Sequence, residues 1–127
     1  MVVHIFSDIS YHPKLNIGVV AFRIIDDSDG KSVLTILHKD GMRNTQLEKE
    51  SINIALETLD NIEEIDQIII YTDCQDVISN KYADNISIVK IKAHKKKSEC
   101  NNLELCLREV DIESRRELRK RVKHMNI

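Results

Sequence analysis

The sequence is poor in residues that mark several protein classes. It has no tryptophan, one proline, three glycines and three cysteines in 127 positions. The cysteines are odd in number and lack CxxC spacing, which argues against a zinc knuckle or a disulfide framework and favours a reducing compartment. Apolar runs are short, as at residues 67–71, so no transmembrane helix and no membrane partner are expected.

The chain shows no linker, repeat or low-complexity segment, and we expect a single domain over residues 1–127. Hydrophobic residues make up 42% of it, which is enough for one core. Residues 1–8 have neither a basic leader nor a long apolar stretch, so no signal peptide is expected. A cytoplasmic location is the resulting prediction.

The net charge of −2 hides an uneven distribution along the chain. Residues 1–89 hold 7 Lys and Arg against 15 Asp and Glu, whereas residues 90–127 hold 12 against 6. An acidic body with a basic C-terminal third suits a nuclease, because carboxylates hold metal and cations hold phosphate. For any single residue of the basic third, a solvated charged helix is the alternative interpretation.

Hydrophobic periodicity predicts an α/β fold whose order is three strands, helix, strand, short helix, strand and long helix. A turn signal at residues 26–30 joins the second and third strands as a hairpin. A five-stranded mixed sheet between helices, in three layers, is the expected architecture. The strands are predicted at residues 2–7, 17–25, 32–38, 66–72 and 86–92, and the helices at 44–62, 75–80 and 100–123.

Three carboxylates stand out by position. Asp8 is expected to end the first strand and Asp73 the fourth, and strand ends at the carboxyl edge of a sheet are where α/β proteins bind ligands. Glu48 shares a helical stripe with Ile52 and Ala55, so it is expected to face the core, where an unpaired carboxylate is costly. The alternatives are a capping box with Thr45 as the N-cap, or an exposed helix end.

A cluster of these acids would suit a divalent cation. All-oxygen ligands favour Mg²⁺ or Mn²⁺ over zinc. Two such ions some 4 Å apart can activate water and stabilise the leaving oxygen in phosphodiester cleavage. Without metal, mutual repulsion would raise the pKa values of the acids strongly.

Four short motifs occur in the order and spacing of a known family. Residues 8–10, Asp-Ile-Ser, resemble the first-strand Asp-Gly-Ser of ribonuclease H-like nucleases, and residues 71–75 resemble their fourth-strand Thr-Asp-Ser-Gln. Residues 44–48 with 55–59 resemble their first helix and its catalytic Glu, and residues 89–94 resemble the Val-Lys-Gly-His before their last helix. The likeness covers nearly the whole chain and implies a ribonuclease H-like three-layer fold.

The resemblance implies a role for each acid. Asp8, Glu48 and Asp73 would hold two Mg²⁺ or Mn²⁺ ions, and His94 would be the mobile histidine that helps proton transfer or product release. By itself, His94 would be an ordinary surface histidine. The fourth acid is either Glu104, in the first turn of the last helix, or Asp111, and about 10 Å of helix separates the two. The remaining acid would pair with an arginine at helical spacing.

The chain also departs from the family. Ile9 and Ala93 replace glycines, and only 21 positions separate Asp73 from His94, so the basic protrusion of some members is absent. The lack of tryptophan removes one familiar DNA contact. Other cations are expected to grip phosphate instead; they are Lys95, Lys96, Lys97, Arg115, Arg116 and Arg119, with Lys120, Arg121 and Lys123 beside them.

Three functions fit this sequence. The first is metal-dependent hydrolysis of the RNA strand of an RNA–DNA hybrid by a two-metal mechanism. The second keeps the site but acts on branched DNA, as a Holliday-junction resolvase. The third is a nucleic-acid-binding module of the same fold without catalysis. Nucleic acid is the one partner indicated, and no protein partner is.

Overall fold

The computed structural model of the protein describes residues 1–74, 77, 82–91 and 101–125. The predicted helix at 75–80 therefore lies, apart from Val77, outside the described residues. The strands are β1 Val2–His12, β2 Ile17–Asp26, β3 Ser32–His38, β4 Gln67–Thr72 and β5 Ile86–Lys90. The helices are α1 Asn44–Glu57, the short 3₁₀ helix η1 Ile62–Glu64 and α3 Asn102–Met125.

The five strands form one mixed sheet in the order β3-β2-β1-β4-β5. β1 pairs antiparallel with β2, and β2 pairs antiparallel with β3. On its other edge β1 pairs parallel with β4, which pairs parallel with β5. The predicted five-stranded mixed sheet is confirmed, with β1 at its centre.

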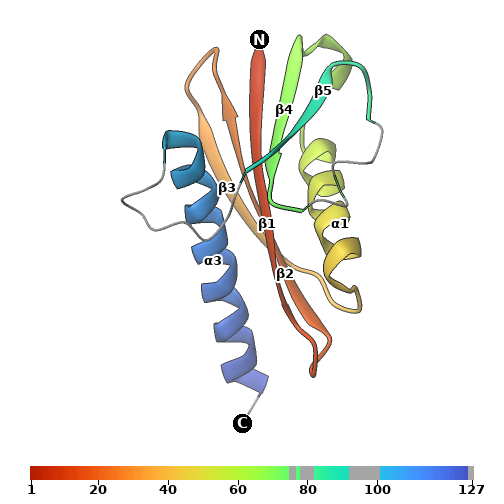
Figure 1. The fold of residues 1–127 in the computed structure, drawn as a ribbon, viewed down its shortest axis with the longest axis vertical. Helices are drawn as coiled ribbons and strands as arrows, with labels where there is room; N and C mark the ends of the chain where they lie inside the picture. Colours follow the sequence, from red (N-terminus) through yellow and green to blue (C-terminus); the bar gives the residue numbers. More distant parts are fainter. Residues whose placement is uncertain (75–76, 78–81, 92–100, 126–127) are drawn as a thin grey trace.

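The helices cover opposite faces of the sheet (Figure 1). Successive side chains of a strand point to opposite faces, so Ile5 joins the cluster of buried residues that includes Ile52 of α1. The next residue, Phe6, joins a second cluster with Leu107 of α3. The sheet is therefore the middle of three layers, as predicted, with a core on each side.

β1 is longer than the sequence predicts. The strand was expected to stop at Ser7 and leave Asp8 at its end, but it continues to His12. The extension is stabilised by β2, which stays paired with β1 until His12 lies opposite Ile17. Asp8 therefore lies inside a strand, and the prediction of a strand end there is wrong.

The beginning and end of α1 also differ from prediction. Its N-cap is Arg43, which makes no side-chain capping bond, so Thr45 lies inside the helix and the predicted capping box with Glu48 is absent. The helix ends at Glu57 rather than residue 62, and the Thr58 hydroxyl donates to the Ala55 carbonyl at 2.7 Å. No helix in the described part of the chain is long and apolar enough to cross a membrane.

Gly18 lies where the sheet, the loop after β3 and α1 meet. A Cβ at this position would lie 2.5 Å from the Lys39 carbonyl oxygen and 2.7 Å from Leu47 Cδ2. We predict that Gly18→Ala lowers the free energy of unfolding by about 1–3 kcal/mol through overpacking, measured by urea denaturation. Gly30→Ala meets no atom within 4 Å and carries only the strain of its positive φ. An unchanged urea midpoint for Gly18→Ala would contradict this packing.

Candidate metal centre

The register of β1 and β4 brings two aspartates together. The last paired residues of these strands are Phe6 and Tyr71, whose rings stack with centroids 4.5 Å apart. Two residues further along each chain come Asp8 and Asp73, and a two-residue step returns a strand to the same face. β4 ends at Thr72 while β1 continues, so among the residues that the structure describes no strand pairs with this edge of β1 beside Asp8.

Glu48 reaches this opening from α1. The buried residues of α1 include Leu47, Glu48 and Ser51. The Ser51 hydroxyl hydrogen-bonds the Ser7 hydroxyl of β1 at 2.7 Å, which holds the first turns of α1 against the strand beside Asp8. The predicted inward position of Glu48 is confirmed, and neither an exposed helix end nor a capping box explains it.

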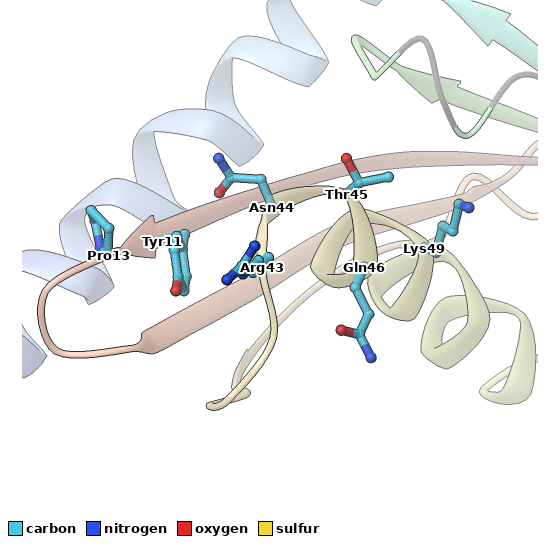
Figure 2. Close-up of a pocket in the computed structure, with 7 residues that line it drawn as sticks. All are labelled: Tyr11, Pro13, Arg43, Asn44, Thr45, Gln46 and Lys49. Atoms are coloured by element: carbon cyan, nitrogen blue, oxygen red, sulfur yellow. The ribbon is translucent and has the colours of Figure 1, made fainter.

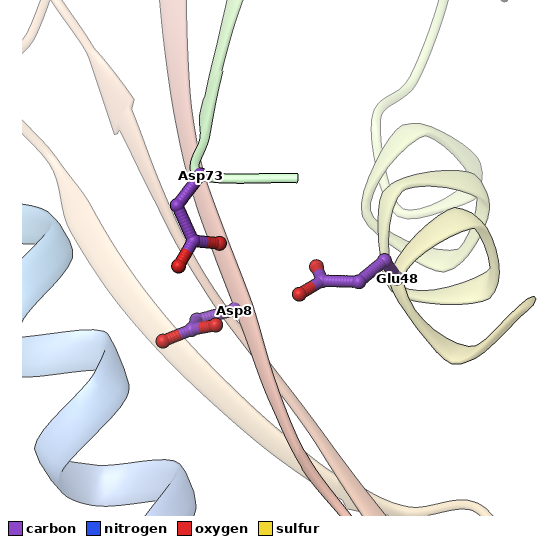
Figure 3. Close-up of side chains that lie close together, drawn as sticks. All are labelled: Asp8, Glu48 and Asp73. Carbon is purple, nitrogen blue, oxygen red and sulfur yellow. The ribbon is translucent and has the colours of Figure 1, made fainter. Parts of the chain in front are cut away.

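The three carboxylates converge between the end of β4 and α1 (Figure 3). One oxygen from each of Asp8, Glu48 and Asp73 lies within 4.8 Å of the other two. Asp8 and Glu48 are buried, with 5% and 7% of their surface exposed. The Asp8 carboxylate accepts a 2.9 Å hydrogen bond from the Ile9 amide.

The pKa values of both buried acids are raised. Burial is the main cause, with the charges of Glu48 and Asp73 next, and together they raise the pKa of Asp8 far above its ordinary value of 3.8. Burial, followed by the charge of Asp73, raises the pKa of Glu48 from 4.5 to about 8. A cation among these oxygens would remove the repulsion and let the acids ionise.

The donor set fits a divalent cation such as Mg²⁺ or Mn²⁺. Among the residues that the structure describes, no hydrogen-bond donor reaches the buried Glu48 Oε2. An unsatisfied buried carboxylate oxygen costs free energy unless a proton or a cation neutralises it. All-oxygen sites built on carboxylates suit magnesium and manganese.

Asp111 of α3 lies beside this cluster. It shares a hydrogen bond with the Asp8 carboxyl. On its other side, Arg115 Nε lies 3.0 Å from Asp111 Oδ1. This i,i+4 pairing was predicted for the acid left out of the site, and the structure instead gives it to the acid beside Asp8. Asp111 and Arg115 line the same hollow of about 470 Å³ as the three clustered acids.

Glu104 has a different environment. Its amide donates to the Asn101 side-chain oxygen at 2.8 Å, while Glu104 Oε1 accepts from the Asn101 amide at 3.2 Å. This reciprocal pair is a capping box for α3. Glu104 is not among the residues that line the hollow of the acids.

A pair of buried serines fastens α3 beside the acids, a contact that the sequence analysis missed. Ser10 Oγ and Ser114 Oγ lie 2.9 Å apart, and Ser114 Oγ also donates to the Asp111 carbonyl at 2.9 Å. Ser114 occupies a core position of α3 in step with Leu107 and Val110. A polar residue on that apolar stripe was the signal that could have revealed the contact.

A second hollow of about 840 Å³ adjoins the first (Figure 2). Tyr11 and Pro13 line it from the end of β1 and the turn that follows, and its other residues lie at the start of α1. Tyr11, Asn44 and Thr45 line both hollows, so the two adjoin one another. The second hollow is lined by Tyr11, Pro13, Arg43, Asn44, Thr45, Gln46 and Lys49.

The predicted phosphate-binding cations have different surroundings. His94 and Lys95, Lys96 and Lys97 lie outside the described residues. Arg116 pairs with Glu113 at 2.8 Å on the exposed side of α3. Arg119 Nε approaches the Arg115 carbonyl at 3.4 Å, so its side chain folds back toward Arg115, one turn nearer the acids.

Solved structures share this fold. LC11-RNase H1 in complex with an RNA/DNA hybrid matches with a TM-score of 0.56 and 16% identity, over 70% of this chain and 84% of that chain. RNase H1 from the halophilic archaeon Halobacterium salinarum NRC-1 matches with a TM-score of 0.56 and 19% identity, over 72% of this chain and 86% of that chain. Prototype Foamy Virus Protease-Reverse Transcriptase matches with a TM-score of 0.61 and 10% identity, over 89% of this chain and 20% of that chain. The chain therefore has a ribonuclease H-like fold, as its motifs predicted.

No protein-family model and no curated protein sequence matches the chain. The identity to these structures is low, and their likeness establishes the fold.

We predict that Mg²⁺ stabilises the protein more as the pH rises. Glu48 keeps its proton in the metal-free fold up to a pH of about 8, whereas the unfolded chain releases it around its ordinary pKa of 4.5. Stability without metal therefore falls as pH rises through this window. Thermal melts with and without Mg²⁺ should show a larger increase in Tm at about pH 8.5 than at about pH 5.5.

Asp8→Asn provides the matched test of the cause. The variant replaces a carboxyl whose pKa is raised by burial with a neutral amide, so folding no longer has to protonate this residue. Its Tm without metal should therefore exceed that of the wild type by about 3 °C or more near pH 8. It should also lose most of the Mg²⁺ response. Asp60→Asn changes an exposed aspartate outside the cluster and should respond like the wild type. If Mg²⁺ raised the Tm of Asp8→Asn as much as that of the wild type, Asp8 would not be part of a metal site.

Proposed function

We propose that this chain is a metal-dependent endonuclease that hydrolyses the RNA strand of RNA–DNA hybrids. One observation carries the proposal: three carboxylates converge within 4.8 Å of one another at an open hollow of a ribonuclease H-like fold. Two of them are buried at a cost that a cation would offset. This is the donor set that metal-dependent phosphodiester chemistry requires.

Asp8, Glu48, Asp73 and Asp111 would hold the cations, with Asp8 in contact with the other acids. Glu48 and Asp73 act on its carboxyl as neighbouring charges, and Asp111 hydrogen-bonds it. Two bound Mg²⁺ or Mn²⁺ ions, some 4 Å apart, would supply an activated water and stabilise the leaving oxygen. The chain's own part is to hold the acids on rigid elements, β1, α1 and α3, so that the substrate phosphate meets a fixed set of oxygens.

We assign the role of fourth acid to Asp111 rather than Glu104. Asp111 contacts Asp8 and lines the hollow of the acids, whereas Glu104 caps the helix that carries both residues. Arg115, paired with Asp111, holds that carboxylate at the hollow. The guanidinium would also be within reach of a phosphate lying over the acids.

The two adjoining hollows offer a path for the substrate backbone. From the acids the path passes Tyr11 to the start of α1, where Arg43 and Lys49 supply positive charge. Arg115 lines the hollow of the acids from α3, and Arg119 lies one turn further along that helix. Cations on both α1 and α3 beside an acidic centre match a polyanion whose cleaved phosphate lies over the acids.

The hybrid is our choice of substrate because LC11-RNase H1, which shares this fold, was crystallised with one. His94 remains a prediction as the residue that helps proton transfer or product release. Lys95, Lys96 and Lys97 likewise remain predicted phosphate contacts. The resolvase and the non-catalytic module stay as outcomes of the experiment below.

The test is a cleavage assay on labelled substrates. The wild type should cut the RNA strand of a hybrid in Mg²⁺ or Mn²⁺, and should cut double-stranded RNA, single-stranded DNA and a four-way junction far more slowly. Asp8→Asn should reduce the rate by about a thousand-fold or more, because it removes a carboxylate that would hold the metal. Asp60→Asn should keep wild-type activity.

Each other result has a distinct meaning. Cleavage of the junction alone would replace the proposal with a resolvase. If no substrate were cut and Asp8→Asn behaved like the wild type in every assay, the nuclease proposal would be wrong and a binding module would remain.

The choice of fourth acid gives a second prediction. Asp111→Asn should lower kcat by about a hundred-fold, since the carboxylate next to Asp8 loses its charge. Glu104→Gln keeps an oxygen that can cap α3, so its activity should stay within about two-fold of the wild type. Steady-state kinetics in Mg²⁺ would decide, and the reverse ranking would move the role to Glu104.

A further inference from the structure

One arginine of α3 joins three segments at the far end of the substrate path. Arg121 Nη1 donates to the Gly18 carbonyl at 3.0 Å and to Asp40 Oδ1 at 2.6 Å, and Nη2 donates to Asp40 Oδ2 at 3.0 Å. The Gly18 amide donates to Asp40 Oδ1 at 3.3 Å. We call Gly18, Asp40 and Arg121 the clasp.

Each member of the clasp belongs to a different segment beside the path. Gly18 of β2 lies opposite Tyr11, the residue that lines both hollows. Asp40 lies in the loop between β3 and α1, three residues before Arg43, the N-cap of α1. Arg121 is on the helix that carries Asp111 and Arg115. The clasp therefore joins the hairpin, the entry to α1 and α3.

Backbone hydrogen bonds extend the clasp into the second hollow. The Lys39 amide donates to the Gly18 carbonyl at 2.9 Å, so that oxygen accepts from both Lys39 and Arg121. The Gly41 amide donates to the Asn16 carbonyl at 3.1 Å, and the Leu47 amide to the Arg43 carbonyl at 2.8 Å. A shift of the Asp40 loop would therefore move the start of α1 relative to Tyr11.

The geometry requires an arginine. Its planar fork reaches both oxygens of Asp40 and the Gly18 carbonyl together, which a single ammonium cannot do. The charge pair itself contributes little, because Asp40 is half exposed. The Arg121 side chain is only 15% exposed, and both of its terminal nitrogens already donate to protein oxygens. The predicted phosphate contact by Arg121 is thus replaced by an internal one.

We propose that Arg121 is a positioning residue for substrate binding: the clasp fixes the start of α1 and the β1–β2 hairpin against α3, and thereby sets the shape of the path. This inference rests on the proposed nuclease function. It separates binding from chemistry, since the clasp includes none of the residues that line the hollow of the acids.

The test compares Arg121→Ala with a matched arginine. Arg23 also links α3 to the sheet, through Glu109 at 3.5 Å and Ser32 at 2.8 Å, its side chain is 21% exposed, and it lines neither hollow. Arg121→Ala should raise KM for the hybrid about ten-fold, with kcat and Mn²⁺ affinity within about two-fold. Arg23→Ala should lose stability but keep KM. Asp40→Ala should reproduce the effect of Arg121→Ala, and Arg121→Lys should restore only part of the lost binding.

Amide hydrogen exchange provides the readout that needs no activity. In Arg121→Ala the amides of Lys39, Gly41 and Leu47 should exchange faster than in Arg23→Ala, because they bind the segments that the clasp joins. Equal exchange and equal KM in the two variants would overturn the inference while leaving the nuclease proposal intact. A wild type that cuts no substrate would instead overturn the nuclease proposal. The exchange comparison would then still decide whether the clasp holds the path.

Discussion

The separation of β1 from β4 after the Phe6–Tyr71 pair is the constraint on which the site depends. Up to that pair the two strands share a ladder, and beyond it β1 continues alone beside β2. Where the two strands separate, Asp8 and Asp73 lie on the same face, and Glu48 reaches them from α1. The same strand therefore serves as the centre of the sheet and the floor of the site.

Burying these carboxylates side by side lowers the stability of the fold, and packing elsewhere must offset that loss. Buried carboxylates repel one another, and each would be more stable in water. Contacts beside the cluster hold the acids in place, among them the Ser7–Ser51 and Ser10–Ser114 hydrogen bonds. The protein gives up stability at the site and keeps the acids ready for a cation.

The sequence was most informative where a pattern is local. The stripe of Glu48, Ile52 and Ala55 follows from helical spacing alone, and the structure buries all three. The end of the first strand was predicted wrongly. At Asp8 the pairing of β1 with β4 has ended, but its pairing with β2 continues to His12. The Thr45 capping box was wrong because Arg43, two residues earlier, is the N-cap.

Distant partners explain what the sequence left undecided. Glu104 has the spacing of the family's fourth acid and Asp111 has its residue type. The choice depends on where α3 crosses β1, which Ser10 and Ser114 fix from positions far apart in the chain. Arg121 looked like one more surface cation, since its partner Asp40 belongs to a distant loop. Charge and spacing predict that such residues matter, but only packing shows what they contact.

Manganese offers the most direct test of the central claim. Crystals of the wild type soaked in Mn²⁺ near pH 8 should show anomalous density at coordination distance from Asp8, Glu48 and Asp73, with a second peak between Asp8 and Asp111. Crystals of Asp8→Asn treated in the same way should lack the first peak. Saturating Mn²⁺ that leaves the three carboxylates without anomalous density would contradict the account.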